Sequence, residues 1–82
     1  SAVDEERGKP DPAVFLRAAR ELGVPAAECV VIEDSKAGVA AARAAGMRVI
    51  AVPPEHLHDD PGYDAADLKL RSLAEITSAM LG

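Results

Sequence analysis

The sequence predicts an α/β fold built on a parallel sheet. Two short apolar runs, residues 29–32 and 48–52, are rich in β-branched residues and typical of strands that are buried on both faces. Residues 36–45 lie between them and have the composition of a helix. Parallel strands need a crossover of this kind, so the order strand, helix, strand indicates a βαβ unit of a doubly wound sheet.

A first helix is predicted over residues 12–22. Asp11 can accept hydrogen bonds from the first free N–H groups, and Pro12 suits the first helical position. Gly23 is placed to end the helix, and Pro25 prevents its continuation. Its apolar face is expected to consist of Phe15, Ala18, Ala19 and Leu22.

The middle of the chain supplies the βαβ unit. The strand at 29–32 is followed by two acidic residues and a serine, and then by the alanine-rich helix at 36–45. Gly46 ends this helix, and Pro53 and Pro54 end the next strand. Many alanines make a thin helix, which can lie close to the sheet.

The C-terminal third begins with a long polar loop, residues 53–66. Long loops in compact domains are often functional. Residues 68–70 are a candidate strand, and Ser72 can cap a last helix. The apolar stripe of that helix is predicted to belong to the core and consists of Leu73, Ile76, Thr77 and Met80.

The predicted sheet is incomplete. The run at 29–32 is apolar on both faces and should have a strand on each side, yet only one neighbouring strand follows it directly. Three short parallel strands make a poor independent domain. We therefore expect residues 1–82 to be part of a larger doubly wound sheet, whose other strands come from sequence not included here.

Composition excludes several classes of function. The chain has 82 residues and a net charge of −5, so its surface would repel a nucleic-acid backbone. Its beginning has neither the apolar segment of a signal peptide nor a membrane span. Cys29 is the single cysteine, which indicates a small buried apolar residue rather than a disulfide. We expect a cytoplasmic protein that binds neither nucleic acid nor membrane.

Two adjacent carboxylates, Glu33 and Asp34, follow the first predicted strand directly. In open parallel sheets, ligands bind beyond the carboxyl ends of the strands. A carboxylate pair there suits Mg²⁺, which takes one or two protein carboxylates together with water and phosphate oxygens. The alternative is that Asp34 or Ser35 only caps the helix that follows, and the residue types leave both open.

Lys9 adds a positive charge to this picture. It lies between Gly8 and Pro10, just before the first predicted helix, where its ammonium group could project towards a phosphate. A single lysine in a loop is usually only solvated. Together with the acid pair, however, the Gly-Lys-Pro loop resembles an arrangement known from a family of enzymes that bind phosphate and metal.

Two stretches of sequence resemble the third and fourth motifs of the haloacid dehalogenase superfamily. They are "GKPDPAVFLRAARELGV" and "CVVIEDSKAGVAAARAAGMRVIAV". The tail "PPEHLHDDPGYDAADLKLRSLAEI" is similar in pattern to bacterial hexitol and 2-deoxyglucose-6-phosphate phosphatases. The resemblance points to the subgroup of β-phosphoglucomutase and the sugar-phosphate phosphatases. It implies a Rossmann-like core, three-layer α/β/α in the full protein, with residues 1–82 as the C-terminal half of that core.

The resemblance also implies roles for individual residues. Lys9 would be catalytic, binding and neutralising the phosphoryl group. Glu33 and Asp34 would bind Mg²⁺, and Ser35 would support their loop by hydrogen bonding. The implied activity is Mg²⁺-dependent hydrolysis of a small sugar phosphate through a phosphoaspartate intermediate. Phosphoryl transfer of the β-phosphoglucomutase type is the alternative.

One part of the superfamily pattern is missing. The nucleophile and the acid/base of the superfamily come from an Asp-x-Asp motif after an N-terminal strand, and no Asp-x-Asp occurs in this sequence. The cap domain that selects the substrate is also absent. The chain alone is therefore expected to be inactive and to need the N-terminal part of the same protein.

Two other classes of protein share some of these features. A phosphoacceptor receiver domain is disfavoured, because Lys9 precedes the acid pair and the second strand ends in Val52 and Pro53 rather than in an acceptor aspartate. The other rival is a non-catalytic α/β module that associates through the open edge of the strand at 29–32.

The loop histidines suggest a second metal site. His56 and His58 lie close in sequence to Asp59 and Asp60. Transition-metal sites usually draw ligands from more than one element, so a solvated loop is the favoured interpretation.

Overall fold

A computed structural model describes residues 11–82, and the predicted phosphate-binding Lys9 lies outside this part of the chain. Three parallel strands form the sheet, with β2 (Arg48–Ala51) between β1 (Val30–Glu33) and β3 (Leu68–Lys69). The helix α2 (Lys36–Ala44) connects β1 to β2. This confirms the predicted α/β fold and its βαβ unit.

The two longer helices begin and end close to the predicted residues. The first, α1 (Ala13–Leu22), starts where the Asp11 carboxylate accepts a hydrogen bond from the Ala13 N–H at 2.9 Å. It ends at Gly23, whose φ of 70° is left-handed and therefore favours glycine. Gly46, which follows α2, has the same left-handed backbone conformation, with φ 79°. No helix within residues 11–82 has the length and apolar character of a membrane span.

Small residues build the core between α2 and the sheet. The main buried cluster consists of Val39, Ala42, Val49, Ala51 and Tyr63. Because most of these side chains are short, α2 can approach β2 closely. Asp67 also links α2 to β2. Its carboxylate accepts a hydrogen bond from the Val49 N–H of β2 at 2.8 Å and one from the Arg43 side chain of α2 at 3.2 Å.

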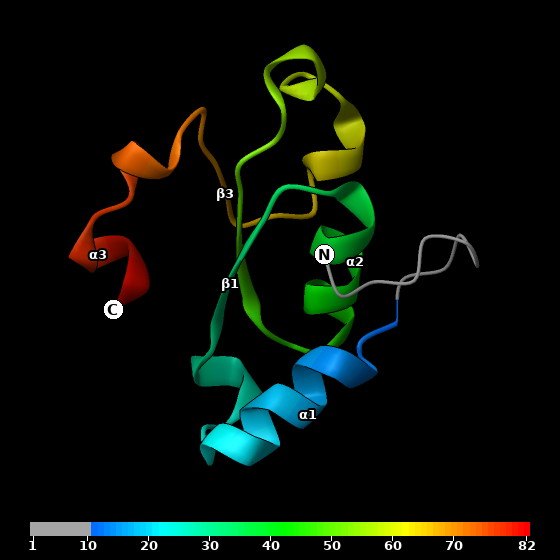
Figure 1. Ribbon diagram of the computed structural model, residues 1–82, viewed down its shortest axis with the longest axis vertical. Helices are drawn as coiled ribbons and strands as arrows, with labels where there is room; N and C mark the ends of the chain where they lie inside the picture. Colours follow the sequence, from blue (N-terminus) through cyan, green and yellow to red (C-terminus); the bar gives the residue numbers. More distant parts are fainter. Residues whose placement is uncertain (1–10) are drawn as a thin grey trace.

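The predicted apolar face of the first helix is only partly buried. Ala19 is buried and Phe15 packs against the core, whereas Ala18 is exposed and Leu22 is 74% exposed. The reason is the position of α1, which lies at the end of the sheet where β1 begins (Figure 1). Ala19 of α1 packs in a small cluster with Ala45 and Met47, which lie in the connection between α2 and β2, so only one side of α1 is covered.

The prediction of one last helix with a core stripe was wrong. Ser72 does cap a turn, but this is the short 3₁₀ segment Leu73–Glu75, and a separate short helix, α3 (Ser78–Leu81), follows it. Ile76 between them has extended backbone, and Leu73 is 63% exposed. No residue from 71 to 82 is buried, so this segment lacks the packing that sustains a continuous helix.

The strand β1 is less covered than its sequence predicts. Within residues 11–82 it pairs only with β2, and Ile32 on it is 42% exposed. Its last residue, Glu33, is part of the strand and pairs with Ala51. The outer edge of β1 is thus open in the described part of the chain. In Figure 1, α2 and α3 lie on opposite sides of the strands.

Candidate functional site

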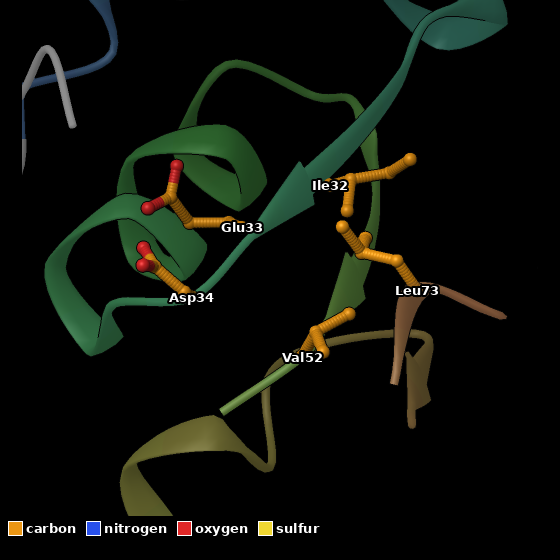
Figure 2. Close-up of a pocket in the computed structure, with 5 residues that line it drawn as sticks. All are labelled: Ile32, Glu33, Asp34, Val52 and Leu73. Carbon is orange, nitrogen blue, oxygen red and sulfur yellow. The ribbon is translucent and has the colours of Figure 1, made fainter. Parts of the chain in front are cut away.

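The acid pair lies at the carboxyl end of β1. Glu33 ends the strand, and Asp34 and Ser35 form the turn into α2. Figure 2 shows both carboxylates on the side of α2, while Ile32, Val52 and Leu73 gather on the other side of β1. The topology therefore brings Glu33, Asp34 and Ser35 to the edge of the sheet where ligands of parallel α/β folds bind.

Glu33 is held by the turn that follows it. Its Oε1 accepts hydrogen bonds from the Ser35 hydroxyl at 3.0 Å and from the Ser35 N–H at 3.3 Å. The same hydroxyl oxygen accepts from the Gly38 N–H at 3.0 Å and so caps α2. One carboxylate oxygen of Glu33 is thus fixed by the first turn of the helix.

Gly38 leaves the space that Glu33 occupies. A Cβ atom at position 38 would lie 2.2 Å from the Glu33 Cδ and 2.3 Å from its Cγ, far inside van der Waals contact. These atoms belong to the outer part of the side chain, whose Oε1 is bonded to Ser35, so Glu33 would have to move away from Ser35 to make room. A glycine is therefore needed here for close approach rather than for its backbone conformation.

The carboxylate of Asp34 stands apart from this network. Within residues 11–82 it takes part in no hydrogen bond or ion pair, and the residue is exposed. Only its backbone is held, by the Tyr63 hydroxyl, which donates to the Asp34 carbonyl oxygen at 2.7 Å. Of the two residues that could have capped α2, Ser35 is the cap. In the described part of the chain, no other side chain holds the Asp34 carboxylate.

The loop after β2 reaches back to the same turn. Its Asp60 accepts from the Lys36 ammonium at 3.0 Å, and Gly62 packs directly on the Lys36 side chain. The Gly62 N–H and then the Lys36 ammonium lower the pKa of Asp60 from its ordinary value. The loop is therefore folded over the start of α2 rather than merely solvated.

Sequence reasoning missed Tyr63. It is the one tyrosine of the chain, in a sequence with 2% aromatic residues, and it follows Pro61 and Gly62 in a polar loop. A lone aromatic residue in such a loop was the available signal, because a large apolar side chain there is expected to return to the core. In the structure Tyr63 is 2% exposed.

Alkaline pH should release this tyrosine. Burial raises its pKa above the ordinary value of 10.0. The stabilisation is therefore fully present below about pH 10 and is lost as the pH rises through the higher pKa of the folded state. Because the chain has one tyrosine and no tryptophan, its near-ultraviolet absorbance reports Tyr63 alone. We expect a midpoint above that of the urea-unfolded chain, and equal midpoints would contradict the burial.

The two loop histidines do not come together as a metal centre. His56 is exposed, and the nearest acid to the half-buried His58 is Asp59, with 3.5 Å between Nδ1 and Oδ1. Across residues 11–82, no group of three or more histidine, cysteine, aspartate or glutamate side chains is arranged to hold a metal ion.

Comparison with known proteins decides the family. The haloacid dehalogenase-like hydrolase family matches residues 1–46, more than half of the chain. The chain belongs to this family. The resemblance inferred from the motifs around Lys9 and the acid pair is therefore confirmed.

Two relatives of this chain are a protein named as a hexitol phosphatase and a CbbY protein. The chain is 47% identical over 70 residues to hexitol phosphatase B of Escherichia coli K12, covering 85% of this chain and 32% of that protein. It is 48% identical over 66 residues to protein CbbY of Rhodobacter capsulatus, covering 80% of this chain and 29% of that protein. This haloacid dehalogenase-like chain thus spans about a third of the length of these relatives.

Solved structures agree with the fold of this haloacid dehalogenase-like hydrolase. A CbbY variant from Rhodobacter sphaeroides, in complex with a xylulose bisphosphate, superposes with a TM-score of 0.73 at 40% identity, over 82% of this chain and 29% of that one. A family hydrolase from Deinococcus radiodurans, with bound phosphate and sodium, gives 0.73 at 39% identity, over 88% and 34%.

A pocket adjoins the acid pair of this chain. It has a volume of about 380 Å³ and is lined by Ile32, Glu33, Asp34, Val52 and Leu73. Figure 2 shows its three apolar residues together on one side of β1, whereas the Glu33 and Asp34 carboxylates point to the other side, towards α2.

Proposed function

We propose that this chain is the C-terminal half of the core of a Mg²⁺-dependent hydrolase that acts on a small sugar phosphate. The observation that carries the proposal is the position of Glu33 and Asp34 at the ligand-binding edge of a haloacid dehalogenase-like sheet. The names of the relatives support the substrate class, since they include hexitol phosphatases and a CbbY complex with a xylulose bisphosphate.

The donor set at this edge fits Mg²⁺. Carboxylate oxygens are the ligands that a hard divalent cation prefers, and Mg²⁺ needs only one or two of them because it keeps water and binds phosphate. Asp34 offers an exposed carboxylate, and Glu33 offers Oε2 while its Oε1 is held by Ser35. When bound, the cation would withdraw negative charge from the phosphoryl oxygens.

The proposed roles divide between binding and support. Asp34 holds the cation, and Glu33 binds or orients beside it from a position that Ser35 fixes. Lys9 binds the phosphoryl group and offsets its negative charge as that charge is redistributed in the transition state. A phosphate bound in the Deinococcus radiodurans relative supports this kind of ligand for the fold.

The nucleophile of the proposed reaction lies outside this chain. Hydrolysis through a phosphoaspartate needs an aspartate that attacks phosphorus, and the sequence has no Asp-x-Asp motif to supply it. We propose that the strand carrying the nucleophile pairs with the open edge of β1, where Ile32 is 42% exposed. A cap domain would complete the substrate pocket. This chain joined to the nucleophile strand and the cap domain is called the longer protein.

Phosphate release by the longer protein tests the proposal. Hexitol and hexose monophosphates should release inorganic phosphate with Mg²⁺ and not after its removal by EDTA, and Lys9→Ala should slow the release at least about tenfold. Conversion of the sugar phosphate to an isomer without phosphate release would instead indicate a mutase. Phosphate release that continues at the same rate after EDTA treatment would contradict the proposed role of the acid pair in metal binding.

A further inference from the structure

A tyrosine from the loop after β2 reaches the turn of Asp34 and Ser35, called the cation-binding turn because Asp34 is the proposed cation ligand. Tyr63 follows Asp34 by 29 residues, and its hydroxyl donates to the Asp34 carbonyl oxygen at 2.7 Å. The bond is partly buried, which protects it from competition with water. It joins the backbone of Asp34, the proposed cation ligand, to a part of the chain that is distant in sequence.

The ring of Tyr63 is fixed by the core rather than by the loop. It belongs to the buried cluster that includes Val39 of α2 and Val49 and Ala51 of β2. Because these residues are fully or almost fully buried, the ring cannot shift without disturbing α2 and the sheet. Its hydroxyl is therefore a fixed point from which the Asp34 carbonyl is held.

A second contact acts on the other side of Ser35. The Lys36 ammonium pairs with Asp60 at 3.0 Å, and the Lys36 side chain lies against Gly62. Asp60 also accepts from the Gly62 N–H at 2.8 Å, which keeps the 3₁₀ turn Pro61–Tyr63 in shape. The turn thus contacts residues on both sides of Ser35.

The geometry points to Tyr63 as a positioning residue for the Asp34 carboxylate. This inference rests on the proposed function, since it assigns Asp34 the cation. The hydrogen bond fixes the orientation of the Asp34 peptide, and the direction of the side chain follows from that of its backbone. Groups that orient a metal ligand from behind contribute to metal affinity even though they never touch the metal. Loss of the hydroxyl should therefore weaken cation binding more than it slows the reaction.

The variant Tyr63→Phe in the longer protein tests this inference, because phenylalanine keeps the ring in the core and removes only the hydroxyl. The Mg²⁺ concentration for half-maximal hydrolysis should rise about fivefold, the usual effect of losing one such hydrogen bond. The kcat at saturating Mg²⁺ should stay within about twofold of the original, since the hydroxyl bonds to the Asp34 backbone carbonyl and not to a carboxylate. Calorimetry with Mg²⁺ alone should show the same fold-change in the dissociation constant.

Val49→Ala is the matched control. Val49 belongs to the same buried cluster but pairs with Val31, nearer the start of the strands, and has no hydrogen bond to the cation-binding turn. The Val49→Ala variant should lower the melting temperature at least as much as Tyr63→Phe does. It should leave the dissociation constant for Mg²⁺ unchanged.

The outcomes separate the inference from the function it depends on. The positioning role of Tyr63 would be overturned if the dissociation constant for Mg²⁺ did not change in Tyr63→Phe, or if it rose equally in Val49→Ala. The proposed function would still stand in either case. An original protein that neither binds Mg²⁺ nor needs it for hydrolysis would overturn both. A shift confined to Tyr63→Phe supports the inference.

Discussion

Replacement of Asp34 by asparagine should reduce Mg²⁺-dependent hydrolysis by the longer protein at least about a hundredfold, as removal of a key electrostatic group from an active site commonly does. Asparagine has nearly the same size and loses only the charge that attracts the cation. Stability should change little, because within residues 11–82 the carboxylate makes no hydrogen bond or ion pair and the residue is exposed. Activity and thermal unfolding measured on the same preparation check both parts.

Asp64→Asn is the control for a general effect of charge. Asp64 is exposed and follows the turn Pro61–Tyr63, so this variant removes one negative charge from the loop that folds over the site. It should keep its activity within about twofold of the original, because surface charges of this kind interact only weakly. Equal losses in the two variants, or full activity in Asp34→Asn, would contradict the role of Asp34.

Replacement of Gly38 by alanine should destabilise the protein, although the same change usually stabilises a helix. Alanine in a helix interior is about 1 kcal/mol more favourable than glycine. Here its Cβ would lie 2.2 Å from the Glu33 Cδ, and forcing a methyl group into a packed site costs about 1–3 kcal/mol. We expect a net loss of up to about 2 kcal/mol in the free energy of unfolding measured with urea, with weaker Mg²⁺ binding as Glu33 moves away from Ser35.

A double variant isolates the cause. In a Glu33→Ala background the three atoms closest to the new Cβ are gone, so Gly38→Ala should become neutral or stabilising by up to about 1 kcal/mol. This reversal of sign is the specific result of the close contact between positions 33 and 38. Destabilisation of equal size in both backgrounds would mean that some other contact excludes alanine.

Local patterns in the sequence were enough to predict the βαβ unit and the place of the acid pair. The strands at 29–32 and 48–52 are short runs of β-branched residues, and Ser35 and Gly46 mark the ends of α2 within the sequence itself. Once the strands are parallel, the position of Glu33 and Asp34 at the carboxyl edge follows from topology. The residue types alone predicted a candidate ligand site at this edge, and the resemblance to the family motifs added the prediction of a phosphatase.

Contacts between distant parts of the chain could not be predicted in this way. The hydroxyl of Tyr63 meets Asp34 because the loop folds over α2. The spacing of apolar residues predicts helices and strands, but it does not predict where a loop packs. The stripe from Leu73 to Met80 has the spacing of a helix, but spacing alone does not create a surface to pack on, and residues 71–82 remain unburied. Lys9 lies outside the described residues, and its role is a prediction from the family motif.

The most direct test of the proposed division of the active site compares the 82-residue chain alone with the longer protein in one assay of Mg²⁺-dependent phosphate release from a sugar phosphate. We expect hydrolysis by the longer protein that Asp34→Asn reduces at least about a hundredfold. We expect no turnover by the chain alone, because the proposed function gives the chain the groups that bind the cation and the phosphate but not the nucleophile. Hydrolysis by the purified chain alone would contradict this division.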